Sequence, residues 1–214
     1  MMRTHYVQEL ESVRQGLVQM GETTLALLAE ALSAVADPRP GPSAKASELE
    51  ARTDHQHRLI HDQSLNLITL QAPVASDARL VTGVLDAIVD LELTGDYSYE
   101  IVTLTSAMHG RPPSQVLNQM SSIGAKVQEC LSVAVDSWRT LDRARAVSVR
   151  PQQAPIRAEC GALYEKLSQL TSLPGDPATY VDLMLISRHL ERILRHAACV
   201  ADQAAEAAPL GQAG

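Results

Sequence analysis

The spacing of proline residues constrains the fold of this 214-residue chain more than any other feature of its sequence. Proline ends helices because it lacks a backbone N–H and its ring clashes with the preceding turn. The segments between the prolines are long and rich in Ala, Leu, Glu and Gln, which are strong helix formers. The prolines occur in groups at 38–42, 112–113, 151–155 and 174–177, with single ones at 73 and 209. This spacing predicts six long helices.

Most of the predicted helices are longer than an average helix. They are expected over residues 4–35, 43–70, 76–108, 114–146, 156–173 and 178–206. Ser76 and Ser114 are candidate N-caps, because a serine side chain can accept a hydrogen bond from the first turn of a helix. Long helices joined by short loops form antiparallel bundles. The predicted fold class is therefore all-α.

A weak internal repeat divides the chain into two similar parts. Met20-Gly21 followed by Leu32 has the same spacing as Ile123-Gly124 followed by Val135. A second pair of similar runs lies at 91–96 and 190–195. Such a repeat predicts two copies of one three-helix unit, at 1–110 and 111–206, and a frayed tail at 207–214. An unrelated six-helix bundle with chance similarity is the alternative.

Charge and aromatic content exclude several classes of function. The chain has 18 Lys and Arg residues against 25 Asp and Glu residues, a formal net charge of −7. This balance argues against a basic surface that binds nucleic acid or an anionic membrane. Aromatic residues make up 3% of the chain, too few for the stacking platforms of proteins that bind single-stranded nucleic acid. No nucleic-acid partner is expected.

Cysteine usage and hydrophobic runs predict the compartment. The three cysteines, Cys130, Cys160 and Cys199, are odd in number and form no CxxC motif. They therefore indicate neither a disulfide framework nor a zinc ribbon, and a reducing compartment fits best. The first residues contain no apolar segment typical of a signal peptide, and no run of about 20 apolar residues could span a membrane. The chain is expected to be cytoplasmic.

Motifs of common enzymes are not found in the sequence. There is no glycine-rich nucleotide-binding motif, no GxSxG and no HExxH. A Glu-x-x-His pair, which the ferritin-like di-iron bundles use, does not occur either. No acid and base can be assigned to a substrate. We therefore expect a protein that is not an enzyme and has no catalytic residues.

The segment 76–108 carries four acidic residues of two kinds. At about 100° per residue, the apolar stripe around Leu85 places Glu92 and Asp96 in its middle. The same projection places Asp86 and Asp90 on the solvent side. A carboxylate that faces the core of a bundle is costly unless it is paired, hydrogen-bonded or bound to a metal. Glu92 and Asp96 are therefore the candidates for a function.

Three interpretations of Glu92 and Asp96 stay open on these residues alone. Their i, i+4 spacing points both carboxylates the same way, and Gly95 between them allows close approach of a helix or an ion. They could bind a cation, pair with Arg or Lys of another helix, or belong to a surface that contacts a protein partner.

The segment 43–70 offers a second half of a metal site. Glu50, Asp54, His57 and His61 follow one another along one strip of the predicted helix. Carboxylate and imidazole ligands suit iron, manganese or zinc. The alternative is a solvated face, on which the acids form ordinary helix ion pairs with Arg58.

The segment 178–206 does not repeat this pattern. Glu191 occupies the position of Glu92, but Arg195 stands at the position of Asp96. The two residues are spaced as an i, i+4 ion pair, which predicts a salt bridge and no second metal cluster.

Several of these runs resemble the PhoU family of phosphate-uptake regulators. The family pattern is roughly RQPxAxDLR followed by LERIGDH. The chain has QAPVASDARL at 71–80, LELTGD at 91–96, LERI at 190–193 and His196, and its first helix, from Tyr6 through Met20-Gly21, is also similar. The resemblance covers nearly the whole chain.

The resemblance implies two similar three-helix bundles packed side by side. It implies a cytoplasmic negative regulator of the phosphate-starvation response, which acts between the phosphate ABC transporter with its ATPase and a sensor histidine kinase. Members carry E/DxxxD motifs that can bind iron or zinc. Glu50 and Asp54 match the motif of the second helix, Glu92 and Asp96 that of the third, and Glu191 its counterpart in the second repeat.

The chain departs from the family pattern in its second half. Arg195 replaces the aspartate, and the segment from Glu159 onward is not an ExxxD motif. A metal site, for iron, zinc or manganese, is therefore expected at Glu50, Asp54, Glu92 and Asp96 of the first repeat. Direct binding of phosphate is not expected, because no cluster of basic residues suited to an anion is evident.

Two other functions remain as alternatives to regulation of phosphate uptake. One is a metal-binding helical bundle with a role in metal homeostasis. The other is a helical scaffold or dimerisation module, in which Glu92 and Asp96 form structural ion pairs. A homodimer is expected because long helices with Ala- and Leu-rich faces often pair.

Overall fold

The described residues of the chain fold into six long helices and one short one. The computed structural model describes residues 2–38, 41, 43–108, 110, 112–171 and 177–209. The helices are α1 (Met2–Ala36), α2 (Ala44–Gln71), α3 (Ala75–Ala107), α4 (Ser114–Thr140), α5 (Arg143–Val147), α6 (Gln153–Leu170) and α7 (Pro177–Ala207), with a 3-10 turn at Arg150–Gln152. These ranges contain no strand, so the all-α prediction is confirmed.

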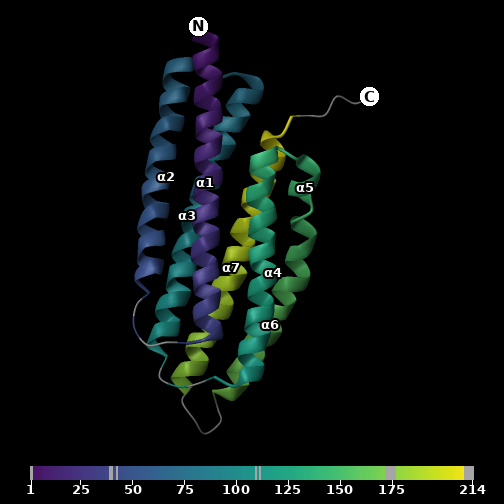
Figure 1. Cartoon of the computed structure of the whole chain (residues 1–214). Coiled ribbons are helices and arrows are strands. Elements are labelled where there is room, and N and C mark those ends of the chain that lie inside the picture. The colour runs from purple at the N-terminus through teal and green to yellow at the C-terminus, as the bar shows by residue number, and fades with distance from the viewer. Residues whose placement is uncertain are drawn as a thin grey trace.

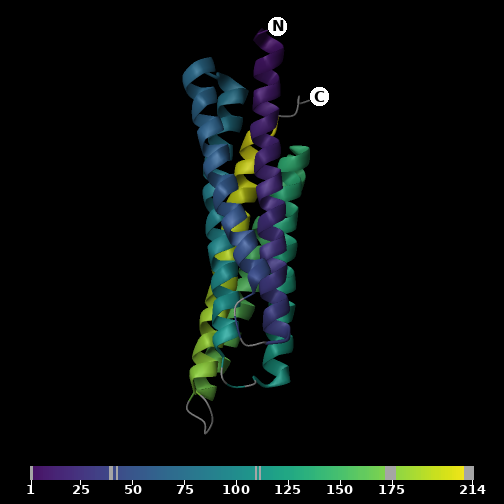
Figure 2. The ribbon, with the colours of Figure 1, turned by 60° about the vertical axis from the view of Figure 1, so that its left-hand side comes forward.

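The helices form two three-helix bundles that lie side by side (Figure 1). Helices α1, α2 and α3 pack together as one bundle, and α4, α6 and α7 as the other. The bundles meet where α3 packs on α7 and where α1 packs on α4. The view turned by 60° shows the same elongated arrangement (Figure 2). This confirms the predicted architecture, whereas the unit boundaries 1–110 and 111–206 stay a prediction.

The sequence prediction was wrong at the end of the fourth helix. A single helix was expected over 114–146, but α4 ends at Thr140 because Leu141 adopts the left-handed conformation, with φ of 51°. The Asp142 side chain then accepts a hydrogen bond from the Arg145 amide and starts α5. No proline or glycine marks this break, so the spacing of those residues could not reveal it.

The N-caps and the last helices also differ from prediction. The N-caps of α3 and α4 are Val74 and Pro113, without a side-chain hydrogen bond, and not Ser76 or Ser114. Helix α6 begins at Gln153, since Pro155 lies in its first turn, where a missing N–H is tolerated. Its expected last residues, 172 and 173, lie outside the described residues. So do residues 210–214 of the expected tail.

The predicted repeat is visible in the contact between α1 and α4. A Cβ atom added to Gly21 of α1 would lie 2.6 Å from a methyl group of Val135 in α4. A Cβ atom added to Gly124 of α4 would overlap with a methyl group of Leu32 in α1. Gly21 and Gly124 are equivalent in the repeat, as are Leu32 and Val135, so each bundle places the same glycine against the same apolar position of the other.

We expect Gly21→Ala to lower the free energy of unfolding by up to about 2 kcal/mol. Compared with glycine, alanine stabilises a helix by about 1 kcal/mol. Its methyl group would, however, overlap with Val135, and overpacking costs about 1–3 kcal/mol. Val135 is buried, and a β-branched side chain in a helix has one favoured rotamer, so it cannot turn away.

Urea unfolding followed by circular dichroism would measure this change. Gly161→Ala is the matched control, because an added Cβ atom there meets nothing within 4 Å. That variant should gain about 0.5–1 kcal/mol. If the two variants shift the unfolding midpoint in the same direction, the close contact of α1 with α4 is not what constrains Gly21.

The side chain of Trp138 in α4 contacts helices of both bundles. Its side chain is fully buried, and its indole N–H donates to the Val200 carbonyl of α7 at 3.0 Å. The ring also lies over Gly83 of α3, where an added Cβ atom would be 3.2 Å from Cη2. At the same end of α4, the Arg14 guanidinium of α1 donates to the carbonyls of Trp138 and Arg139 at 2.6 and 2.7 Å.

Candidate metal centre

Helix α2 approaches α3 closely at Gly95. A Cβ atom added there would lie 3.3 Å from Cγ2 of Thr53, and Thr53 is buried. The missing side chain therefore lets the two helices lie close together, as expected from the sequence. This approach brings Asp96, the next residue of α3, toward the acids on the adjacent turns of α2.

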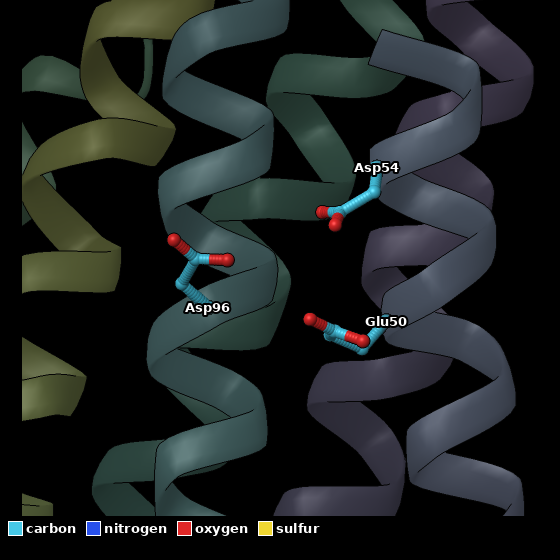
Figure 3. Close-up of side chains that lie close together, drawn as sticks. All are labelled: Glu50, Asp54 and Asp96. Atoms are coloured by element: carbon cyan, nitrogen blue, oxygen red, sulfur yellow. The ribbon is translucent and has the colours of Figure 1, made fainter. Parts of the chain in front are cut away.

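Three carboxylates meet at this point, as Figure 3 shows. Glu50 and Asp54 come from α2 and Asp96 from α3, and one oxygen of each lies within 4.8 Å of the others. Glu50 and Asp54 are half-buried, and Asp96 is exposed. Among the described residues, none of the three accepts a hydrogen bond or forms an ion pair. Three negative charges are thus held together without a partner from the protein.

The electrostatics of this carboxylate cluster (Glu50, Asp54 and Asp96) disfavour its charged form. Burial, followed by the charge of Asp54, raises the pKa of Glu50 above its usual value. Although Asp96 is exposed, partial desolvation also raises its pKa, and the charges of Glu92, Asp54, Glu50 and Glu100 add to the effect. A bound cation would remove this repulsion, because an opposite charge nearby favours the ionised carboxylate.

The fourth predicted ligand, Glu92, lies apart from the cluster. Its Oε1 is 3.4 Å from Nδ1 of His57, so these two residues pair with each other. His61 is exposed, and its Nδ1 lies 3.3 Å from Asp62 Oδ1. The structure therefore brings together three of the four predicted residues, and neither histidine joins them.

The sequence predicted the wrong direction for the buried face of α3. The projection was centred on Leu85, which is only half-buried, whereas the buried face is centred on Leu91 and Ser98. Small buried residues of α3, namely Ala87, Thr94, Gly95, Ser98 and Thr105, shift the face, and a search for large apolar side chains overlooks them. Glu92 and Asp96 consequently lie at the edge of the buried face, beside α2.

The opposite edge of the same face holds a residue that the sequence misplaced. Asp90 was expected on the solvent side, but it is half-buried and faces α7. Its carboxylate lies 2.7 Å from Nδ1 of His196 and accepts a hydrogen bond from Gln203 at 3.0 Å. Both partners come from the other bundle, so no local pattern in the sequence could reveal the pairing.

The donor atoms decide which metals fit the carboxylate cluster. All three donors are carboxylate oxygens, a set that suits hard cations such as manganese. Iron also fits, since helical bundles hold it largely through carboxylates. Zinc fits less well, because its protein sites favour sulfur and nitrogen ligands. The residues present therefore match manganese or iron better than zinc.

The second bundle has no comparable acidic group within the described residues. Glu191 does not pair with Arg195, as was expected, but with Arg157 of α6 at 3.2 Å and Arg188 of α7 at 2.7 Å. Arg157 comes from another helix, and such a contact between distant segments cannot be found from i, i+4 spacing. The expected salt bridge was wrong, and basic residues surround Glu191.

The chain matches a known protein family over most of its length. The model of the PhoU domain matches residues 17–105 and 120–204. A PhoU homologue of the phosphate-specific transport system from Synechocystis is 26% identical, over 94% of this chain and 90% of that protein. The homologue from Caulobacter vibrioides is 29% identical, over 92% of this chain and 86% of that protein.

Two solved structures share the fold. The crystal structure of PhoU from Pseudomonas aeruginosa superposes with a TM-score of 0.88 at 24% identity, over 93% of this chain and 96% of that one. The phosphate transport system regulatory protein PhoU from Streptococcus pneumoniae gives 0.81 at 19% identity, over 93% of this chain and 94% of that one. Because the family model matches most of both bundles, the chain belongs to the PhoU family.

Proposed function

We propose that this chain is a cytoplasmic negative regulator of phosphate uptake and of the phosphate-starvation response, and that it is not an enzyme. The observation that carries the proposal is the match of the PhoU domain to both halves of the chain. The curated relatives are phosphate-specific transport system accessory proteins, and the chain aligns with most of their length. The part of the chain that the structure describes has no helix that is long and apolar enough to cross a membrane.

The mechanism in this proposal is a shift of population in a partner protein. A regulator that binds one state of a transporter or kinase more tightly shifts that partner toward the bound state. The partners proposed here are the ATPase of the phosphate ABC transporter and a sensor histidine kinase. A homodimer of this chain is also part of the proposal, and its mass in solution would test that element separately.

A metal at the carboxylate cluster is the second element of the proposal. Its support is the group of three unpartnered carboxylates from two helices. Glu50, Asp54 and Asp96 would hold manganese or iron, and the bound ion would cross-link α2 to α3. This role is structural or regulatory. A metal at this site would also fit the alternative function, a metal-binding bundle with a role in metal homeostasis or as a scaffold.

Deletion of the gene should raise alkaline phosphatase activity in cells grown at high phosphate. The reason is that loss of a negative regulator leaves the phosphate-starvation response active when phosphate is plentiful. Restoring the gene should return the activity to the level of the parent strain. The measurement is an enzymatic assay of the three strains at high and at low phosphate.

Unchanged alkaline phosphatase activity in the deletion strain would contradict the regulatory function in this organism. The metal content of the untagged protein then separates the alternatives. A stoichiometric metal would support the metal-binding bundle, and a metal-free protein would support the scaffold.

A further inference from the structure

The second bundle carries a pocket whose charge is opposite to that of the carboxylate cluster. It lies on α6 and α7 and has a volume of about 390 Å³. The lining residues are Gln153, Arg157, Arg188, Glu191, Arg192 and Arg195. Four guanidinium groups thus share this arginine pocket with one carboxylate, in a chain whose formal net charge is −7.

Much of the positive charge in the arginine pocket is not neutralised by the protein. Glu191 pairs with both Arg157 and Arg188. Among the residues that the structure describes, Arg192 and Arg195 have no carboxylate within ion-pair distance. Although burial alone would raise it, the pKa of Glu191 lies below its usual value because Arg188 and Arg157 donate hydrogen bonds to its carboxylate.

Neighbouring side chains hold the guanidinium groups in place. Arg188 lies over the ring of Tyr164 at 4.9 Å, and Arg192 lies over the ring of Tyr97 at 5.2 Å. Such stacking orients a planar guanidinium at little cost. Side chains that are already oriented lose less conformational entropy when a ligand binds.

Arg195 is positioned through a chain of hydrogen bonds from the core. Its Nη2 lies 3.1 Å from Nε2 of His196. Arginine has no acceptor, so Nε2 must accept and the Nδ1–H must donate to Asp90, 2.7 Å away. His196 is buried, and Asp90 belongs to α3 of the other bundle. The fold therefore fixes the orientation of Arg195.

We propose that the arginine pocket binds a phosphate group of a small anion. Guanidinium groups pair with phosphate through two parallel hydrogen bonds, and arginine is the residue that proteins favour for this contact. The pocket is concave and gathers the four arginines around one volume, which suits a compact anion better than an extended acidic segment of a partner. The proposal departs from the expectation from the sequence that phosphate does not bind directly, and that expectation is what the titration below tests.

The equivalent faces of the two bundles would then bind ligands of opposite charge. Glu191 and Arg195 stand at the positions of Glu92 and Asp96 in the repeat. The first bundle gathers carboxylates beside that position, and the second gathers arginines. The inference rests on these charges and does not depend on the regulatory role, so phosphate binding and the alkaline phosphatase phenotype can fail separately.

Isothermal titration calorimetry of the full chain with orthophosphate and pyrophosphate tests the proposal. Arg192→Gln combined with Arg195→Gln should weaken binding of the tighter ligand by at least about tenfold, since hydrogen bonds between charged groups are lost. Arg79→Gln is the matched control, because Arg79 is exposed on α3 of the other bundle. It should leave the affinity unchanged, and circular dichroism verifies that all variants are folded.

Glu191→Gln should change the affinity for phosphate in the opposite direction. It removes the one carboxylate in the pocket, so the affinity for the phosphate anion should rise and its dependence on salt should become steeper. A purely structural role of the arginines would not produce tighter binding in this variant. Sulfate at equal ionic strength distinguishes phosphate recognition from general attraction of anions.

Three results would overturn the proposal. No binding of either phosphate would leave the arginines available to an acidic protein partner instead. Equal binding in the double variant would place the anion elsewhere on the molecule. Sulfate binding as tight as phosphate binding would show a site without the proposed selectivity.

Discussion

Replacing Trp138 with alanine is expected to lower the free energy of unfolding by about 3–5 kcal/mol. The side chain is fully buried where α4, α3 and α7 meet. Its removal leaves a cavity between the two bundles and removes the hydrogen bond to the Val200 carbonyl. Urea unfolding should be followed by circular dichroism, because Trp138 is the chain's single tryptophan and its removal abolishes that fluorescence signal.

Trp138→Phe separates packing from hydrogen bonding. Phenylalanine retains most of the buried ring but cannot donate to Val200. Because that carbonyl lies within α7 and keeps its helical N–H donor, the expected loss is the net value of one hydrogen bond, about 0.5–1.5 kcal/mol. Val181→Ala is a surface control, because Val181 is exposed on α7, and its effect should stay within about 0.5 kcal/mol. A loss of less than about 1 kcal/mol in Trp138→Ala would show that the bundles do not depend on this contact.

Asp54→Asn is expected to weaken manganese or iron binding by about 100-fold or more. Even residues that only support a metal ligand contribute about 10–100-fold to affinity, and Asp54 lies among the three carboxylates themselves. The measurement is the rise in melting temperature with added metal, which reports binding to the folded state. Asp86→Asn is the control, since Asp86 is an exposed aspartate of α3 away from the cluster.

The same substitution should stabilise the protein when the metal is removed by a chelator. The pKa values of Glu50 and Asp96 are raised in the folded state, so the folded protein binds more protons than the unfolded chain as these groups titrate. Stability of the metal-free protein should therefore fall as the pH rises from the unfolded pKa values, about 4, through the raised ones. Asp54→Asn should reduce this fall.

Two outcomes would contradict the metal site at this cluster. One is an equal response of the parent protein and Asp54→Asn to added metal. The other is a rise in melting temperature that Asp86→Asn abolishes and Asp54→Asn does not. The first would show that Asp54 is not a ligand, and the second would move the site to another face of α3.

The sequence predicted the helices well because their ends are marked by local chemistry. The proline groups limit where helices can run, and Ser43 caps α2 through a hydrogen bond from the Ala46 amide. The end of α4 escaped prediction because it depends on the left-handed conformation of Leu141, which is not a conformation that leucine favours. Local propensity does not encode such a break, since packing in three dimensions imposes it.

The candidate sites were predictable only in part for a related reason. The meeting of Glu50, Asp54 and Asp96 follows from i, i+4 spacing on α2 and from Gly95 on α3, and both are visible in the sequence. Of the arginine pocket, Arg188, Arg192 and Arg195 follow one face of α7 at spacings visible in the sequence, whereas Arg157 reaches Glu191 from another helix. A contact between distant segments requires knowledge of which helix faces which.

The reciprocal contact of Gly21 with Val135 and of Gly124 with Leu32 has an evolutionary consequence. Two equivalent surfaces that exchange the same contact form the kind of interface that two identical subunits make around a two-fold axis. The two halves of this chain thus meet as a symmetric dimer would after its subunits became covalently joined. Each glycine is coupled to an apolar residue in the other half, so a larger side chain at position 21 should be accompanied by a smaller one at 135. The same compensation should link positions 124 and 32.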